Sequence, residues 1–492
     1  MSGSGRQLAT RVGLRLGPDP SRVLARLFVP GQELALDTES RVTGVLRRIL
    51  ALSEETVVAT LEVVLERYGG RHRDLRAVLR TNYEKVAHRV PEGVEVSSRR
   101  SLLIGACFTN EYSVEAAALF NPSVVAHPDQ SGLTPGAVRF VLSLRAVGEG
   151  HISSVEFRSG VVGPGHELRV DEPGPLLEAG EHQEATHNRA LFSAKLTEAG
   201  ADAESSSFLM RRLPASFDEA ALQEALLALA SQRVTRHGAA RTDALARRIA
   251  ACNYEVDFLP GSRLSERVLW PHGPSESQGI EDARFVRFHD DSGDESYMAT
   301  YTAFDGTQVQ PQLIETSDFR HFKMSQLAGP AAKNKGMALF PRKIGGHFVA
   351  MSRYDRESSA IATSEDGRIW SSPTTLHSPR QPWELIQLGN AGSPIETPSG
   401  WLVLTHGVGP MREYALSAIL LDLEDPRRVI SALPRPLMIA QEDERDGYVP
   451  NVLYSCGAMA YGTELLLPYG VSDSSVRFAF VDTALLLDLL AA

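Results

Sequence analysis

Carboxylates and cations lie close together in a few short segments of this sequence, between stretches that are otherwise apolar. Glu281, Asp282 and Arg284 share one such segment, Gly-Ile-Glu-Asp-Ala-Arg. Further cations interrupt later apolar runs: Lys335, Arg353 and His406. A carboxyl group in a partly closed site can have a raised pKa and donate a proton to a leaving oxygen. Lys and Arg that converge on one point bind phosphate or carboxylate, so the combination predicts acid-assisted chemistry at an anion site.

Other polar residues occupy comparable places elsewhere in the chain. They are Asn121, Arg145, Tyr301, Asp305 and Tyr454. The carboxylates and cations have structural alternatives: Glu281, Asp282 and Arg284 as a surface turn or an ion pair, Lys335 as a solvated turn residue, and Arg353 and His406 as caps of strand edges. Because these polar residues recur at equivalent places in successive units of the sequence, we expect all of them to share one site.

Five units of similar plan position these residues. Each has a polar or Pro-containing start, a short inner strand, an apolar middle strand and a third strand. We predict the middle strands at 139–148, 295–304, 346–355, 400–409 and 462–471. We predict the third strands at 151–157, 311–319, 358–367, 414–423 and 475–484. The last four middle strands start 51, 54 and 62 residues apart, and a repeat of about 50 residues built of antiparallel strands is typical of a propeller blade.

The sequence therefore predicts an all-β fold, a five-bladed β-propeller whose inner strands bring the polar residues to one opening. The alternative is a series of unrelated hairpins in a mixed α+β protein. Between the first two middle strands the spacing is 156 residues, about a hundred more than one repeat requires. Ser216 and Glu219 form a capping-box pattern ahead of spaced leucines, so we predict a helical insertion at about 180–252, between blades one and two.

The first hundred residues have a helical pattern instead. Ser53 can cap a helix whose apolar residues are spaced three and four apart, and Gly69-Gly70 follows its end. A second amphipathic stretch comes next. Their apolar faces must pack either on the main domain or on another subunit, which leaves a homo-oligomer open. We predict an N-terminal helical extension over 1–105 and a catalytic propeller over 106–490.

Composition excludes several classes of protein. The formal net charge is −11, with 43% hydrophobic and 23% charged residues. This acidic balance argues against sequence-independent binding of nucleic acid. Three distant cysteines offer no disulfide framework. The first twenty residues lack the apolar core of a secretory signal and no apolar run approaches a membrane span, so we expect a cytoplasmic location and no membrane partner. The histidines are dispersed and phosphate-loop or zinc motifs are lacking, so we expect no metal and no cofactor.

Five motifs together resemble glycoside hydrolase family 130. They are GIEDARFVRF, ATYTAFDG, KGMALFPRKIGG, PWELIQLGNAGSPIETPSGWLVLTHGV and YVPNVLYSCGA. The resemblance covers roughly residues 115–485 in the same motif order. It implies a five-bladed propeller and an inverting mannoside phosphorylase, with a minority of mannoside hydrolases in the family. Among its members the chain is similar to long bacterial ones with an N-terminal helical extension.

The resemblance also implies roles for residues. Asp282 matches the family's general acid in a Glu-Asp-Pro-Arg motif, with Ala283 in place of proline. The positions that match phosphate ligands are Lys335, Arg353 and His406. Inorganic phosphate is then the co-substrate, which attacks the anomeric carbon of an oligosaccharide. The residues expected to bind the sugar are Asn121, Arg145, Glu281, Arg284, Tyr301, Asp305 and Tyr454.

Three alternatives remain open at the level of sequence. An inverting β-mannosidase of the same family would need a base about 6.5–9.5 Å from the acid, for which Glu149, Glu281 and Glu396 are candidates. A non-catalytic carbohydrate-binding propeller is the second, since a fold does not settle function. The third is a five-bladed fructosidase or arabinosidase, which is disfavoured because Asn121 stands where those enzymes have a nucleophilic aspartate.

Overall fold

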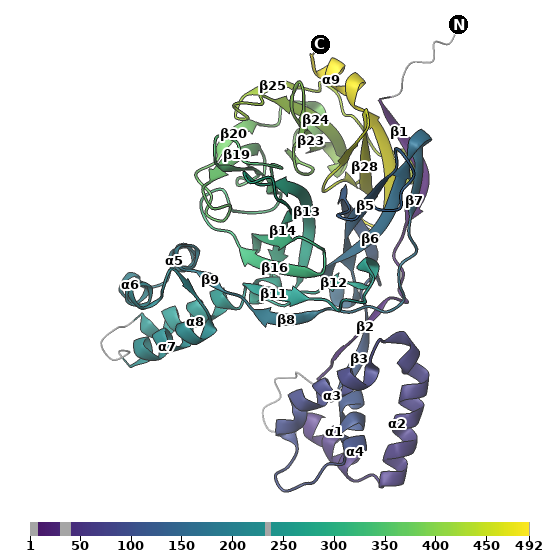
Figure 1. The fold of residues 1–492 in the computed structure, drawn as a ribbon, viewed down its shortest axis with the longest axis vertical. Coiled ribbons are helices and arrows are strands. Elements are labelled where there is room, and N and C mark those ends of the chain that lie inside the picture. The colour runs from purple at the N-terminus through teal and green to yellow at the C-terminus, as the bar shows by residue number, and fades with distance from the viewer. Residues whose placement is uncertain (1–7, 30–40, 232–237, 492) are drawn as a thin grey trace. The chain divides into compact units, whose positions relative to one another are not determined.

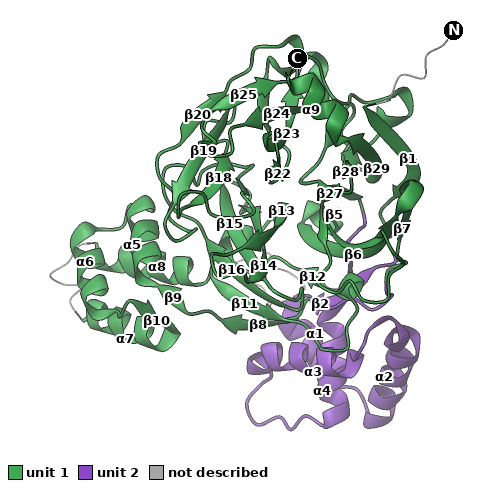
Figure 2. Cartoon of the chain, turned by 45° about the horizontal axis from the view of Figure 1, so that its top comes forward, with its two compact units in different colours: residues 1–18, 117–173, 179–492 green, residues 19–116, 174–178 purple. Residues whose placement is uncertain are grey.

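The computed structural model describes residues 8–29, 41–231 and 238–491. The chain forms two compact units (Figure 2). The sheet unit comprises residues 1–18, 117–173 and 179–492, and the helical unit comprises residues 19–116 and 174–178. The helical unit thus extends beyond the boundary of 105 expected from the sequence, and the segment before Asp19 belongs to the sheet unit.

The helical unit combines helices with a short two-stranded sheet. Its helices are α1 (Arg41–Leu50), α2 (Glu54–Tyr68), α3 (Leu75–Val86) and α4 (Ser98–Cys107). Strand β2 (Val23–Leu27) pairs antiparallel with β3 (Thr109–Ser113). The Ser53 hydroxyl accepts the Thr56 N–H at 3.2 Å, which confirms the predicted cap. Gly69 stays right-handed, with φ −59°, so α2 ends by tightening into a 3₁₀ turn instead of a left-handed glycine cap.

The strands of the sheet unit fall into five groups along the chain. The first contains β4 (Ala118–Ala126), β5 (Val138–Val147), β6 (Ser153–Gly163) and β7 (Glu167–Val170). The second contains β13 (Gly279–His289), β14 (Glu295–Phe304), β15 (Val309–Thr316) and β16 (His321–Gln326), extended by β11 (Tyr254–Asp257) and β8 (Glu181–Glu184). These two groups join through one parallel pair, Gly279 with Ser153, and β12 (Val268–Leu269) pairs with β6.

The remaining groups form separate antiparallel sheets. The third contains β17 (Ala338–Leu339), β18 (Phe348–Ser352), β19 (Ser359–Ser364) and β20 (Thr374–His377). The fourth contains β21 (Gln387–Asn390), β22 (Ile395–Thr397), β23 (Gly400–Val408), β24 (Tyr414–Leu421) and β25 (Val429–Ala432). The fifth contains β26 (Leu453–Tyr454), β27 (Met459–Tyr461), β28 (Glu464–Val471) and β29 (Ser475–Asp482), followed by α9 (Thr483–Ala491). The predicted middle and third strands are confirmed in every group, to within a few residues.

Figure 1 shows the strands of these groups, and apolar clusters connect each group to the next. One cluster joins the first and second groups through Phe157 and Phe285, and another joins the second and third. Trp401 of the fourth group packs with the third group, and a further cluster joins the fourth and fifth. Leu142 of the first group shares a cluster with Phe478 of the fifth. Packing therefore runs from each group to its neighbour and returns from the fifth group to the first.

An N-terminal strand completes the fifth sheet. Strand β1 (Ala9–Leu16) pairs antiparallel with β29, and its residues Val12, Leu14 and Leu16 pack on the cluster shared by the first and fifth groups. The predicted helical segment over 1–105 included neither this strand nor β2. The arginines that alternate with these apolar residues make polar contacts, Arg11 with Glu444 at 3.0 Å and Arg15 with Ser475 at 3.2 Å.

Helices occupy the chain between the first and second groups. They are α5 (Arg189–Glu198), α6 (Ala203–Arg212), α7 (Glu219–Ala230) and α8 (Ala239–Ala250). Their apolar sides form a cluster of their own around Leu196, Leu209 and Leu226. The N-cap of α7 is Asp218, whose carboxylate accepts the Ala221 N–H at 2.9 Å. Ser216 lies in β10 (Ser216–Phe217), which pairs with β9 (His187–Asn188), so the capping box expected from Ser216 is wrong.

A buried glutamate supports the middle strand in two of the groups. Glu276 accepts the backbone N–H of Gly273 at 3.0 Å and the hydroxyls of Tyr254 and Tyr301. In the fifth group, Glu444 accepts the Gln441 N–H at 3.0 Å and the Tyr469 hydroxyl at 2.7 Å. Burial is the main cause that raises the pKa of Glu276. The repeated Glu–Tyr contact fastens a loop to the middle strand.

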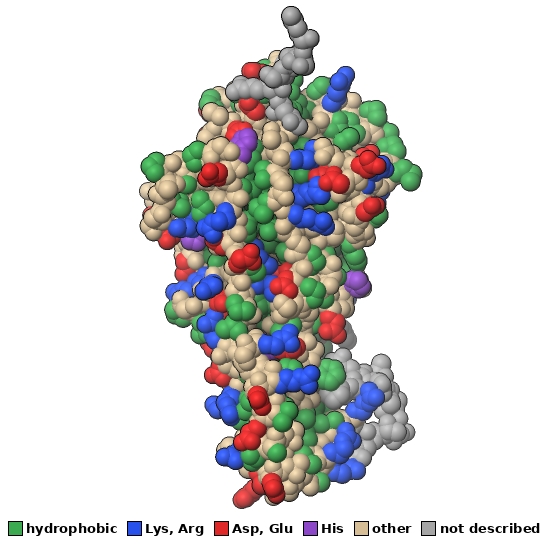
Figure 3. Space-filling view, turned by 90° about the vertical axis from the view of Figure 1, so that its right-hand side faces the viewer, with side chains coloured by type: hydrophobic (Ala, Val, Ile, Leu, Met, Phe, Trp, Pro, Cys, Tyr) green, Lys and Arg blue, Asp and Glu red, His purple; other side chains and the backbone are tan. Residues whose placement is uncertain are grey.

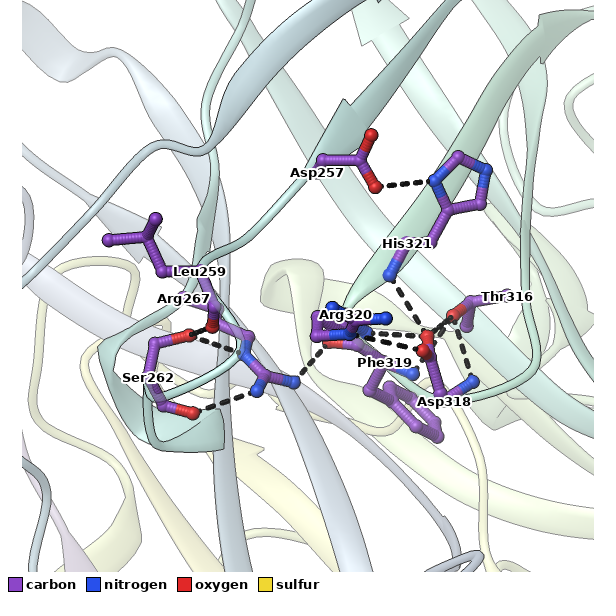
Figure 4. Close-up of polar contacts among 9 residues, drawn as sticks. All are labelled: Asp257, Leu259, Ser262, Arg267, Thr316, Asp318, Phe319, Arg320 and His321. Carbon is purple, nitrogen blue, oxygen red and sulfur yellow. Dashed lines mark hydrogen bonds and ion pairs between the residues drawn. The ribbon is translucent and has the colours of Figure 1, made fainter.

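Arg267 fastens the chain where it returns from the helices to the second sheet (Figure 4). Its guanidinium donates to the carbonyls of Phe319, at 2.7 Å, and Ser262, at 2.8 Å. Asp318 shapes the receiving turn by accepting the N–H groups of Arg320 and His321. The inserted segment is thus tied to the end of β15.

The surface drawn in Figure 3 carries Lys, Arg, Asp and Glu side chains interspersed with apolar ones. None of the helices in the described ranges is both long and apolar enough to cross a membrane.

Candidate active site

Two bulges direct Asn121 and Asp282 toward each other. The register of β4 with β5 shifts at residues 121–122, and that of β13 with β14 shifts at residues 282–283. Asn121 has φ 49° and Asp282 has φ 56°, a region that Asn and Asp tolerate better than most residues. A bulge re-aims the side chain it carries. Asn121 Nδ2 donates to Asp282 Oδ1 at 2.7 Å, with both residues buried.

Arg145 and Lys335 hold the neighbouring carboxylate. Arg145 Nη2 donates to Glu281 Oε1 at 2.7 Å, and its Nη1 lies 3.4 Å from Asp282 Oδ1. The Lys335 ammonium pairs with the other oxygen of Glu281. Arg145 also donates to Ser153 Oγ at 3.0 Å. Glu281 is therefore a bridging carboxylate between the first and third groups of strands, not an unpaired base.

Arg284 extends the site to the fifth group. Its side chain is 1% exposed, and it donates to the Asp282 carbonyl at 2.9 Å and to the Tyr454 hydroxyl at 2.7 Å. The Tyr454 ring lies 4.8 Å from the His406 ring. Arg353 Nη1 in turn lies 3.0 Å from His406 Nε2. Side chains from all five groups of strands thus meet in one continuous set of contacts.

Lys335 and Arg353 line a cavity of about 510 Å³, together with Asn334, Arg356 and Gln387. Within the described residues, Arg353 Nε and Arg284 Nε are buried without a hydrogen-bond partner. A Cβ on Gly389 would lie 2.9 Å from His406 Cε1 and 3.0 Å from Arg353 Cδ, so glycine is needed for this close approach. The cavity is thus lined by a lysine and by a half-buried arginine that keeps an unpaired donor, and such cations are typical of sites that bind oxyanions.

The charged side chains of the site shift the pKa values of Asp282 and His406. Burial opposes ionisation of Asp282, but the charges of Arg145, Arg284 and Lys335 and the Asn121 amide lower the pKa of its carboxyl below the usual value. Burial, with the charges of Arg353 and Arg284, holds the pKa of His406 well below its ordinary value. Because a guanidinium can only donate, His406 Nε2 is the acceptor in its contact with Arg353. His406 is therefore a neutral ring that orients Arg353.

Asp473 interacts electrostatically with Asp282 and Arg145, and the sequence motifs did not reveal it. It lies in the turn between β28 and β29, with φ 48°. Burial and then the charge of Asp282 raise the pKa of Asp473 to about 6, against the pull of Arg145 and Lys335. The one available signal was its position: it follows the fifth middle strand as Asp305 and Arg353 follow theirs.

Two of the expected site residues make their contacts elsewhere. Tyr301 is 1% exposed, and its hydroxyl donates to Glu276 and lies 2.7 Å from Gln312 Oε1, because its side chain leaves β14 on the face opposite to its neighbours Thr300 and Thr302. Asp305 accepts from Arg248 at 2.9 Å and from the N–H groups of its own turn. The other predicted residues are brought together as described above.

Comparison with known proteins places this architecture in a family. A family model described as beta-1,4-mannooligosaccharide phosphorylase, that of glycoside hydrolase family 130, matches residues 261–492. A 1,2-beta-oligomannan phosphorylase of Thermoanaerobacter sp. (strain X514) is 30% identical over 240 residues, which is 48% of this chain and 79% of that protein. A beta-1,2-mannobiose phosphorylase of the same organism is 31% identical over 241 residues, or 48% of this chain and 78% of that protein.

A solved structure is also similar. It is the beta-1,2-mannobiose phosphorylase from Listeria innocua in complex with beta-1,2-mannobiose, 21% identical, with a TM-score of 0.45 over 77% of this chain and 93% of that chain. The sequence relatives, of which this chain covers more than three quarters, decide the assignment. The chain belongs to glycoside hydrolase family 130.

Proposed function

We propose that this protein is an inverting mannoside phosphorylase, which cleaves a β-mannoside with inorganic phosphate and releases a sugar 1-phosphate and a shortened acceptor. The curated relatives that match it are named as phosphorylases of β-mannosides. The observation that carries the proposal is the half-buried guanidinium of Arg353, which lines a cavity with Lys335 and whose buried Nε has no partner among the described residues. A site built for water as nucleophile needs no such anion-binding donors.

In this proposal, phosphate binds to Lys335 and Arg353, with His406 orienting the guanidinium. Arg offers several donors in a fixed plane that match phosphate oxygens, and Lys adds a mobile point charge. The sugar hydroxyls are bound by the surrounding polar side chains, which are Asn121, Arg145, Glu281, Arg284, Tyr454 and Asp473. Phosphate is the co-substrate, and the proposal includes no cofactor.

Asp282 donates the proton. The bond between the anomeric carbon and the glycosidic oxygen breaks, a phosphate oxygen bonds to the carbon from the opposite face, and the proton passes to the leaving oxygen directly or through a sugar hydroxyl. In the free protein the nearby cations lower the pKa of Asp282. A bound phosphate dianion offsets the charge of Lys335 and Arg353, and a sugar removes water. Both changes raise the pKa of a buried carboxyl, so binding prepares the acid.

The proposed fold is a five-bladed β-propeller with a helical insertion between its first two blades. The packing clusters that run from each group of strands to the next, and from the fifth back to the first, support five blades. Helices α5–α8 lie between β6 and β13 in the chain. The proposal also includes a cytoplasmic location, supported by three cysteines that are all free thiols.

Incubation of the protein with short β-mannosides, with and without phosphate, tests the function. We expect sugar 1-phosphate to accumulate only with phosphate, and equal release of free mannose in both conditions would contradict the proposal in favour of hydrolysis. Asp282→Asn is expected to lower phosphorolysis by about 10²-fold or more, the range of a lost general acid. Glu396→Gln is the matched control, because this carboxylate is paired with Arg342 outside the site.

A further inference from the structure

A turn follows the middle strand in each group of strands, and the turn of the first group carries an exposed histidine. This turn comes after β5 as Arg353 comes after β18 and Asp473 comes after β28. His151 lies in it with φ 60°. The contact between Arg145 and Ser153 Oγ, at 3.0 Å, closes the base of the turn. His151 is therefore carried by a turn that begins and ends beside the active site.

Tyr448 is fixed beside the equivalent turn of the fifth group. The next residue, Val449, donates its N–H to the Ser472 carbonyl at 2.9 Å. A Cβ on the preceding residue, Gly447, would lie 2.6 Å from Ser472 Cβ, so the loop packs directly on the turn that holds Asp473. Tyr448 itself is 53% exposed. The backbone therefore sets the position of Tyr448, while its side chain stays open to solvent.

Tyr448 and His151 contact each other through their polar edges. Tyr448 Oη lies 3.0 Å from His151 Nδ1, and the ring centroids are 6.0 Å apart with an angle of 34° between the ring planes. The two rings do not stack, so His151 leaves the faces of the Tyr448 ring uncovered. An aromatic ring that is exposed and already held in one direction is suited to recognition, because little conformational entropy is lost when a ligand binds to it.

This pair of rings joins the two groups of strands that surround the acid. Asn121 of the first group donates to Asp282 at 2.7 Å, and the charge of Asp282 acts on Asp473 of the fifth group. Lys335 and Arg353, which line the phosphate cavity, belong to the third group. Packing runs from each group to the next and returns from the fifth to the first, so the third group is two places away from both. The rings therefore lie on the side of the site remote from the phosphate.

We propose that the Tyr448 ring is the platform on which the acceptor sugar stacks, and that His151 fixes the direction of this ring. The inference rests on the proposed function, because in an inverting displacement the acceptor leaves on the face of the anomeric carbon opposite to the attacking phosphate. The C–H groups on one face of a sugar ring carry partial positive charge, which matches the negative face of an aromatic ring. Tyr448 is then a specificity-determining residue that favours a sugar over a smaller leaving group.

The reverse, synthetic reaction isolates this contact. The full chain is given α-mannose 1-phosphate as donor and mannose as acceptor, and the KM of each is measured separately. For Tyr448→Ala we expect the KM of mannose to rise about tenfold, the upper end of what one aromatic face contributes, while the KM of mannose 1-phosphate stays near the wild-type value. Tyr448→Phe keeps the aromatic face and loses the contact with His151, so its KM for mannose should lie nearer to the wild-type value than to that of Tyr448→Ala.

Ile430→Ala is the matched control, because Ile430 is 46% exposed on β25, the outermost strand of the fourth group. It should leave both KM values unchanged. The inference is overturned if Tyr448→Ala keeps the wild-type KM for mannose, if it raises both KM values equally, or if Tyr448→Phe behaves as Tyr448→Ala does. If the wild-type protein transfers mannose neither to phosphate nor from mannose 1-phosphate, the proposed function itself fails, so the two failures are distinguishable.

Discussion

At the scale of single residues, the site contains two neighbouring carboxyl groups whose titration differs. Cations and the Asn121 amide lower the pKa of Asp282, whereas burial and the charge of Asp282 raise that of Asp473 to about 6. Such divergence is how a site keeps one carboxyl ionised and the other protonated. Because the groups interact, they titrate as a pair, and the pair retains a proton until the pH rises through about 6.

The pH dependence of Asp473→Asn tests this view. We expect kcat/KM of the wild type, which reports the free enzyme, to fall as the pH rises through about 6. In Asp473→Asn the neighbouring negative charge is gone, the pKa of Asp282 falls further, and the decline moves to lower pH. Wild type and variant are compared at equal phosphate, so that ionisation of phosphate affects both alike. A decline at the same pH in both proteins would contradict the coupling.

The same variant has an expected effect on stability. A carboxyl whose pKa is higher in the folded state stabilises the fold below its unfolded pKa of about 3.8, and this contribution is lost as the pH rises through about 6. Asn also tolerates the left-handed backbone at this position. We therefore expect Asp473→Asn to raise Tm at pH 8 but not at pH 4. A Tm that is lower at pH 8 would show that the ionised carboxylate is stabilising.

The sequence motifs revealed Glu281 and Asp282 but not every residue around them. Glu281 and Asp282 share a bulge segment whose composition is unusual for an apolar strand, so the sequence reveals them. Tyr301 was expected at the site but is buried against Glu276, because a polar residue in an apolar strand can point to either face and the sequence does not say which. Asp473 lies in a short turn without a distinctive motif, and only the three-dimensional arrangement brings its charge near Asp282.

At the scale of elements, the buried glutamates and the middle-strand tyrosines form a repeated support. Tyr301 binds Glu276 in the second group of strands, and Tyr469 binds Glu444 in the fifth. Both tyrosines are almost fully buried. Tyr301 therefore has the same structural role as Tyr469, which is to hold a loop onto a middle strand. In the sequence alone, this role cannot be told from that of a site residue.

Tyr301→Phe and Tyr469→Phe should therefore behave alike. Each variant leaves a buried carboxylate with one hydrogen bond fewer, and we expect each to lower the free energy of unfolding by about 1–3 kcal/mol. KM for the sugar and for phosphate should stay near the wild-type values in both. Denaturant unfolding and steady-state kinetics measure these quantities. A large rise in the sugar KM for Tyr301→Phe alone would restore this residue to the substrate site.

Arg267 provides a prediction for the segment that follows the insertion. Arg267→Met keeps most of the side-chain volume but removes the donors to the Phe319 and Ser262 carbonyls. Buried carbonyls left without donors cost about 1–3 kcal/mol each, so we expect a lower Tm. Arg320→Met is a suitable control, because Arg320 is exposed on the neighbouring turn and its side chain pairs with Asp318 of the same turn. Equal Tm values for the two variants would contradict the assigned role.

The positions of the middle and third strands were predictable because these strands are apolar runs that recur at regular spacing. The bulges at 121–122 and 282–283 were not, since a register shift depends on the partner strand. Ser216 was expected to cap α7, but Asp218 stands closer to the first helical turn and provides the cap. In each case the element was foreseen and its local geometry was decided by contacts distant in sequence.

At the scale of the whole molecule, the N-terminal strand ties the start of the chain to its end. β1 pairs along β29 from Ala9 with Val481 to Leu16 with Val476. The helical character of the following hundred residues concealed this strand in the sequence, because a lone strand of eight residues with a partner more than 450 residues away leaves no periodic signal. Its pairing covers an edge that would otherwise be open to other chains.

Deletion of residues 1–17 should therefore destabilise the last sheet. We expect a lower Tm and concentration-dependent aggregation, because β29 becomes an exposed edge strand. Light scattering during thermal unfolding measures both effects. Deletion of residues 1–7 alone is the control, as it keeps β1 intact. If the longer deletion unfolds at the same temperature as the control and stays monodisperse, β1 does not stabilise the fold.

The account rests centrally on an inverting transfer of a mannosyl group to phosphate held by Lys335 and Arg353. NMR spectroscopy of the reaction of the wild-type protein with a β-mannoside and phosphate tests this most directly, because it reports both the product and its anomeric configuration in the first turnovers. We predict α-configured mannose 1-phosphate as the initial product, formed only when phosphate is present. Free mannose formed at an equal rate without phosphate, or a β-configured phosphate ester, would contradict the account.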